Sequence, residues 1–110
     1  MSDKTMKTLT MCGSMRFAKE MAETAFILET EHSFNILQCT YDTQNLPLSV
    51  EEIKAVTAAH YRKIDLSDGI FVMDIGGYTG RSTADEIRYA QIKNKEIYYY
   101  SEFIKQKNRL

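Results

Sequence analysis

Short apolar segments alternate with longer segments of helical periodicity along the whole chain, and this alternation limits the possible folds more than any other feature. Strand-like segments, rich in apolar, β-branched and aromatic residues, are residues 7–12, 34–38, 69–74 and 97–100. The segments between them repeat apolar side chains every three or four positions, which is typical of helices. Strand and helix in alternation predict one α/β domain over residues 1–110, with a Rossmann-like or flavodoxin-like fold of three layers. Its sheet is expected to have roughly four parallel strands, with helices on both faces.

Capping signals locate the ends of the predicted helices. The first helix is expected over residues 16–31 and the third over residues 82–93, where Asn94 is a suitable stop. The second helix begins at a capping box made by Ser49 and Glu52. One face of that helix carries Ile53, Val56, His60 and Ile64. Residues 40–48 form a polar loop, and residues 101–110 are compatible with a short helix or a frayed end.

Composition excludes several classes of protein. The formal net charge of −1 gives no electrostatic reason to expect a nucleic acid polymer or a membrane surface as partner. No apolar run approaches the roughly 20 residues of a membrane span, and the N-terminus lacks the apolar core of a signal peptide, so we expect a cytoplasmic protein. Cys12 and Cys39 do not have metal-type spacing and are expected to be buried thiols. Neither a metal nor an organic cofactor is implied.

The strongest chemical signal is a glycine-rich turn after the third predicted strand. Gly76 and Gly77 allow a sharp turn, and Ser82 or Thr83 can cap the next helix. A helix that starts near Ser82 places Glu86 in its first turn, where the helix dipole favours an ionised carboxylate. Acidic residues at helix starts often contribute only to helix stability, but here the preceding glycines also give a ligand room to approach. We therefore interpret Glu86 as a functional residue.

The carboxyl ends of parallel strands meet at one edge of the sheet, so the loops that follow them should form one cleft. Gly13 and Ser14 follow the first strand, and Arg16 could pair there with a phosphate, although glycine is also a common connector. Counting back along the second helix puts His60 at the cleft edge and Asp65 at the opposite edge. His60 also suits a core position, and Asp65 is expected to be structural.

Other polar residues near the predicted strand ends have two interpretations each. Asp74 can take part in function or only orient the glycine turn. Tyr98, Tyr99 and Tyr100 fit strand packing, with base stacking as the less favoured alternative.

Three motifs together resemble the nucleoside 2-deoxyribosyltransferase family. They are Thr10-Met11-Cys12-Gly13-Ser14-Met15-Arg16 after the first strand, Ser67-Asp68 before the third, and Ser82-Thr83-Ala84-Asp85-Glu86-Ile87-Arg88-Tyr89-Ala90. The similarity spans most of the chain and is greatest to the short members, which include the 2'-deoxynucleoside 5'-monophosphate N-glycosidases. The glutamate motif is its most specific part.

The resemblance implies cleavage or transfer at the N-glycosidic bond of a nucleoside or its 5'-monophosphate. Glu86 would attack the anomeric carbon of the sugar, while Ser14 and Arg16 would hold the 5'-phosphate. The remaining substrate-binding residues would be Gly13, Gly77, Tyr78, Ser82 and Thr83. A homodimer or a higher even oligomer is expected, because family members complete the cleft with a neighbouring subunit and the methionines and tyrosines offer apolar surface.

Two positions depart from the family pattern. Thr10 stands where members commonly have a tyrosine, and His60 stands where they have the aspartate that handles the leaving base. A histidine can also protonate a base, so His60 is the expected partner of Glu86 in catalysis. The alternative is a nucleotide-binding or sensing protein that keeps the cleft without the chemistry. The sequence does not determine whether the acceptor is water or a second base, or which base and which sugar the substrate carries. It also leaves open whether a 5'-phosphate is required.

Overall fold

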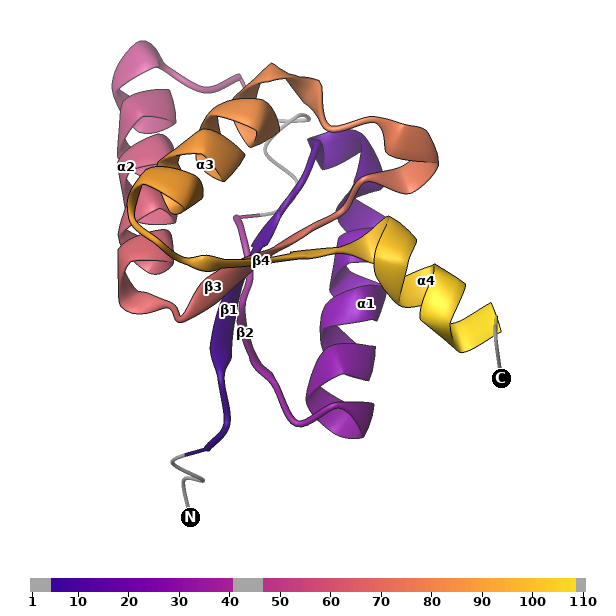
Figure 1. The fold of residues 1–110 in the computed structure, drawn as a ribbon. Coiled ribbons are helices and arrows are strands. Elements are labelled where there is room, and N and C mark those ends of the chain that lie inside the picture. The colour runs from indigo at the N-terminus through magenta and orange to yellow at the C-terminus, as the bar shows by residue number, and fades with distance from the viewer. Residues whose placement is uncertain (1–4, 41–46, 109–110) are drawn as a thin grey trace.

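A parallel β-sheet forms the centre of the molecule (Figure 1). The computed structural model describes residues 5–40 and 47–108. Within these ranges the sheet has four strands in the order β2-β1-β3-β4, and every neighbouring pair is parallel. The strands are β1 (Thr8–Cys12), β2 (Asn35–Leu37), β3 (Gly69–Val72) and β4 (Glu96–Tyr99). This is the strand order of a doubly wound sheet, so the predicted α/β fold is confirmed.

Helices cover both faces of the sheet and complete three layers. Helices α1 and α4 lie on one face and α2 and α3 on the other (Figure 1). The helices are α1 (Ala18–Glu31), α2 (Val50–Leu66), α3 (Gly80–Ile92) and α4 (Tyr100–Asn108), with single 3₁₀ turns η1 (Met15–Phe17) and η3 (Ile75–Gly77). No helix within the described ranges is long and apolar enough to cross a membrane.

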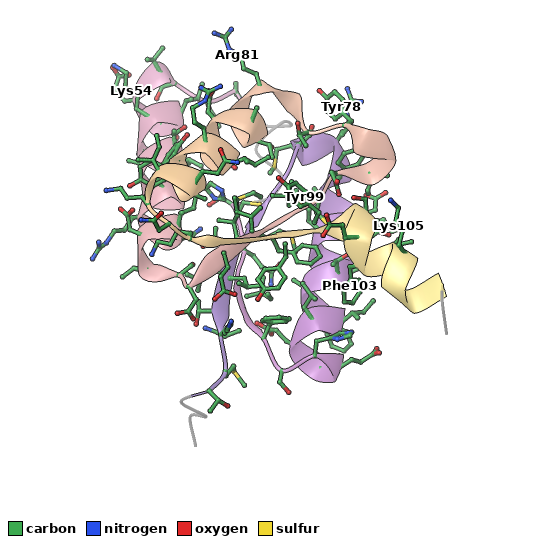
Figure 2. All side chains as sticks on the ribbon, viewed as in Figure 1. Lys54, Tyr78, Arg81, Tyr99, Phe103 and Lys105 are labelled. Carbon is green, nitrogen blue, oxygen red and sulfur yellow. The ribbon has the colours of Figure 1, made fainter. Side chains whose placement is uncertain are left out.

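The alternation of side chains along each strand divides the core into two halves. Leu9 and Phe71 point to the face of α1 and α4, where Phe103 of α4 contacts Phe71 at a centroid distance of 6.1 Å (Figure 2). Cys12 belongs to the opposite half, with α2 and α3. The remaining members of that half are Ile64, Ile70, Val72 and Ala90. The last residue of β1 therefore faces the α2 and α3 layer.

Capping contacts hold the helix ends as the sequence predicts, with one exception described below. Ser49 Oγ accepts from the Glu52 backbone N–H at 3.1 Å, and Glu52 Oε1 accepts from the Ser49 N–H at 2.9 Å, which confirms the capping box. Asn94 adopts a positive φ of 58° after α3 and confirms the predicted stop. Most of the predicted 40–48 loop, residues 41–46, lies outside the described residues.

Helix α2 is longer than the strands beside it. Its 17 residues span about 25 Å, whereas the five residues of β1 span about 17 Å. Only Ile64, near its C-terminal end, is fully buried, and Ile53 in its first turn is 51% exposed. The predicted apolar face therefore covers the sheet with its second half and extends beyond the strand ends with its first half.

Candidate functional site

A pocket of about 460 Å³ lies beyond the carboxyl ends of β1 and β3. These two strands are neighbours in the sheet, but the chain leaves them toward opposite edges, and such a switch point is where doubly wound sheets bind ligands. The segment after β1 forms one wall, α2 a second, and α3 a third. The lining residues used below are Gly13, Ser14, His60, Tyr61, Ser82, Thr83 and Glu86.

Two residues of the pocket lining contact each other, and one of them also contacts a buried thiol. His60 Nε2 on α2 lies 3.3 Å from Glu86 Oε1 on α3, and 3.6 Å from Cys12 Sγ at the end of β1. The side chains of His60 and Glu86 are only 11% and 14% exposed, whereas Cys12 is fully buried and does not line the pocket. An imidazole and a carboxylate thus meet at the pocket wall, and a thiol contacts the imidazole from the core.

Helical periodicity explains why His60 and Glu86 face each other. His60 is four residues before the buried Ile64, so it lies on the inward face of α2 one turn nearer the strand ends. Glu86 has the buried Thr83 three residues before it and the buried Ala90 four residues after it. Both polar side chains therefore lie on apolar stripes and are buried by the packing of α2 and α3.

Burial affects the ionisation of the Cys12 thiol. Burial, and then the neighbouring Glu86 carboxylate, hold the pKa of the Cys12 thiol well above its ordinary range. A thiol in that state is a poor nucleophile, because only the thiolate attacks. Burial and Glu86 also raise the pKa of the Tyr61 hydroxyl at the pocket wall. Glu86 is therefore a better candidate nucleophile than Cys12.

The environment of His60 is unusual for a residue placed for packing alone. Its Nδ1 is buried and has no hydrogen-bond partner within the described part of the chain. A buried polar atom without a partner costs stability, and such atoms are rare in native structures. Within the described residues, the polar contacts of the ring are therefore those of Nε2 with Cys12 and Glu86. The Nδ1 atom adds no hydrogen bond to them.

Six of the sequence-predicted site residues line this pocket, and three do not. Gly13, Ser14, His60, Ser82, Thr83 and Glu86 are among the lining residues. Gly13 also lets the chain pass close to the core, because a Cβ there would come within 2.9 Å of Met21 Sδ and 3.0 Å of Met73 Cβ.

Arg16, Gly77 and Tyr78 lie outside the lining, and Arg16 and Tyr78 contact each other. The Arg16 guanidinium carbon lies 4.1 Å from the centre of the Tyr78 ring, a cation–π arrangement. Tyr78 occupies the turn between β3 and α3 at the periphery of the molecule (Figure 2). Ser14 accepts from the Arg16 backbone N–H at 3.3 Å at the start of η1. The first loop and the glycine turn are thus joined beside the pocket through Arg16 and Tyr78.

The predicted position of Glu86 within its helix is wrong. Helix α3 begins at Gly80, two residues before the predicted cap, and its N-cap residue Thr79 makes no side-chain capping bond. Ser82 and Thr83 therefore belong to the first turn, and Glu86 falls in the second. Because the dipole effect is confined to the first turn, it does not act directly on the Glu86 carboxylate. The contact with His60 takes its place as the local interaction of the carboxylate.

Asp74, whose interpretation was open, and Asp65, which was predicted to be structural, both make structural contacts. Asp74 accepts from the Ser101 N–H at 2.9 Å and from Ser101 Oγ at 2.6 Å, and so joins the end of β3 to the start of α4. Asp65 accepts from the Tyr89 hydroxyl and thereby connects α2 to α3. These contacts favour the structural interpretation of both residues.

Sequence reasoning missed the place of Cys12 and Tyr61 in the site. Cys12 was expected to be a buried thiol, and it is buried, but its sulfur contacts His60. Its position as the last residue of a central strand was the available signal, because that is the edge where ligands bind. For Tyr61, adjacent to His60, the helical pattern gave no comparable signal.

Comparison of the chain with protein-family models, with curated proteins and with solved structures finds no match.

Proposed function

We propose that this protein cleaves or transfers the N-glycosidic bond of a nucleoside or a nucleoside 5'-monophosphate, with Glu86 as the nucleophile. The observation that carries the proposal is the partly buried pair of Glu86 and His60, 3.3 Å apart, in a pocket at the switch point of the sheet. The pocket volume of about 460 Å³ falls in the range of small-molecule sites, about 300 to 1,000 Å³.

The chemistry requires a carboxylate and an acid on opposite sides of the bond that breaks. As the bond between the sugar and the base lengthens, positive charge builds on the anomeric carbon, and the Glu86 carboxylate captures it as an ester. The electron pair of the bond leaves with the base, and His60 supplies the proton that neutralises it. Water or a second base then attacks the ester and releases Glu86.

Substrate binding in this proposal uses the loop after β1 and the start of α3. Gly13 and Ser14 line the pocket beside the short η1 turn, and Ser82 and Thr83 line it from α3. These groups suit the 5' side of the sugar or its phosphate. The Arg16 guanidinium lies on the Tyr78 ring, and in this proposal its flexible side chain turns from that ring to the phosphate.

A second candidate function is nucleotide binding without chemistry. One observation favours it: Glu86 Oε1 is already in contact with His60 Nε2. In retaining glycosidases the nucleophile and the acid are about 5 to 5.5 Å apart, which leaves room for the reacting bond. If a ligand cannot separate the Glu86 and His60 side chains, the pocket binds it and no bond breaks.

A panel of nucleosides and their 5'-monophosphates, with ribose and deoxyribose forms of each base, distinguishes these functions. Each compound is incubated with the protein, and free base is measured by chromatography. The proposal predicts release of free base from at least one compound. Binding detected by calorimetry with no released base supports the second candidate, and neither binding nor release contradicts both.

A further inference from the structure

Two side chains of the pocket wall, His60 and Glu86, and the buried Cys12 beside them offer three metal ligands. Cys12 Sγ, His60 Nε2 and a Glu86 oxygen all lie within 4.8 Å of one another. They come from β1, α2 and α3, and Cys12 and His60 are 48 residues apart, so no spacing motif in the sequence reveals them. Catalytic zinc sites likewise use three protein ligands and leave a fourth position open.

Two of the three distances within the cluster match a tetrahedral zinc ion. With bond lengths of about 2.3 Å to sulfur and about 2.0 Å to nitrogen and oxygen, such an ion separates its ligand atoms by about 3.3 to 3.5 Å. The sulfur to nitrogen distance here is 3.6 Å, and the nitrogen to oxygen distance is 3.3 Å. The Cys12 sulfur and the Glu86 oxygen lie within 4.8 Å of each other, and a bound ion would fix them at about 3.5 Å.

The donor set selects the class of metal. A thiolate and an imidazole favour zinc and other borderline or soft transition metals, whereas magnesium and calcium prefer oxygen ligands alone. Charge is balanced as well. When the Cys12 thiol loses its proton to solvent, the thiolate and the Glu86 carboxylate together offset the two positive charges of the ion. The resulting site is neutral, which suits its burial.

We propose that Cys12, His60 and Glu86 form a Zn²⁺ site whose fourth position opens into the pocket. One Zn²⁺ ion binds Cys12 Sγ, His60 Nε2 and a Glu86 oxygen, and one proton leaves the thiol. While Zn²⁺ is bound, the Glu86 carboxylate coordinates the ion and cannot attack the sugar. The consequence, that Zn²⁺ inhibits turnover in competition with substrate, rests on the proposed function, whereas metal binding itself does not.

Metal binding is tested without any substrate. The chain is treated with a chelator, dialysed, and titrated with Zn²⁺ against a chromophoric chelator. Co²⁺ in place of Zn²⁺ reports the ligands, because a thiolate gives a sulfur-to-cobalt charge-transfer band and a four-coordinate site gives strong visible bands. The expected result is one Zn²⁺ per chain and a charge-transfer band that is absent in Cys12→Ser.

Variants separate the proposed site from other metal-binding groups. Glu86→Gln and His60→Asn should each weaken Zn²⁺ binding by about tenfold or more. The matched controls are Cys39→Ser, the other thiol, which lines the same pocket but is not one of the three ligands, and His32→Asn, the other histidine. Both should bind Zn²⁺ as the wild type does. Circular dichroism checks that each variant is folded, and Glu86→Gln keeps the test valid if Cys12→Ser does not fold.

Several results would overturn the zinc site. They are binding of less than one Zn²⁺ per chain at micromolar concentrations, equal binding of Mg²⁺, a Glu86→Gln variant with wild-type affinity, or a Cys39→Ser variant as weak as Cys12→Ser. None of these results bears on base release by the metal-free protein. Absence of base release with any compound would overturn the proposed function and leave the zinc site in place.

Discussion

At the scale of single residues, His60 connects the packing of the molecule to its proposed chemistry. Its ring is mostly buried between α2 and α3, and yet Nδ1 has no partner within the described part of the chain. The Nε2 atom faces Glu86 and Cys12. Because a buried polar ring of this kind contributes little to stability, its value to the protein is expected to lie in proton transfer.

The variant His60→Asn tests this expectation. Removal of a general acid should lower the turnover number by about 10² or more. The melting temperature should change by only a few degrees, because asparagine matches the inner part of the imidazole ring and only the outer part, with Nε2, is lost. Steady-state kinetics and thermal denaturation measure the two effects. A large fall in melting temperature with unchanged turnover would identify His60 as a core residue.

At the scale of secondary-structure elements, the helix starts differ in how well the sequence predicts them. Helix α2 has a complete capping box, and its start was predicted correctly. Helix α3 begins without a side-chain cap, so a rule that searches for a capping serine or threonine placed its start two residues late. The strands were predicted within one or two residues because a short run rich in apolar and aromatic residues marks each of them.

The candidate site was predictable only in part, because sequence patterns locate residues within one element and not the distances between elements. The strand-end loops and the inward stripes of two helices located Ser14, His60 and Glu86 at one pocket. The contacts of Cys12 with His60, and of Arg16 with Tyr78, depend on the packing of separate elements. No periodicity in the sequence encodes such distances between elements.

The capping box of α2 leads to a stability prediction. Ser49→Ala should lower the free energy of unfolding by about 1 kcal/mol, equivalent to about 4 °C in melting temperature. Thr79→Ala is the matched control, because Thr79 holds the same position in α3 without a capping bond, and it should cost much less. Denaturant titrations measure both variants. Equal losses in the two would contradict a role for the box.

The contribution of Glu52 to this capping box should also depend on pH. The Ser49 backbone N–H and side chain lower the pKa of Glu52, so the folded protein binds this proton less readily than the unfolded chain. The associated stability is present above the ordinary pKa of Glu52 and is lost as the pH falls through its lowered value in the folded protein. The difference in unfolding free energy between wild type and Glu52→Gln should therefore shrink in acid, and a difference that grows would contradict this origin.

At the scale of the whole molecule, exposed apolar side chains bear on assembly. The expectation that methionines supply apolar surface is wrong for most of those described, because Met11, Met21 and Met73 are fully buried. On α2, Val50 and Ile53 are 61% and 51% exposed, and Ile53 lines the pocket. A second copy placed there would cover the apolar part of α2 that extends beyond the strands.

We expect a homodimer or a higher even oligomer formed through this part of α2. Light scattering should give an even multiple of the 12.7 kDa chain mass at micromolar concentrations, and Ile53→Lys should shift the protein to monomer. The matched control is Phe26→Lys on α1, which is also strongly exposed but belongs to the opposite layer, and it should leave the assembly intact. A wild-type monomer at these concentrations would contradict the prediction.

The most direct test of the proposed function is the rate of base release by Glu86→Gln. The amide preserves size and hydrogen bonding but has no negative charge to capture the anomeric carbon. With the compound that wild-type protein turns over best, the variant should still bind, as measured by calorimetry, and its rate of base release should fall to the background. A Glu86→Gln variant that releases base at the wild-type rate would contradict the account.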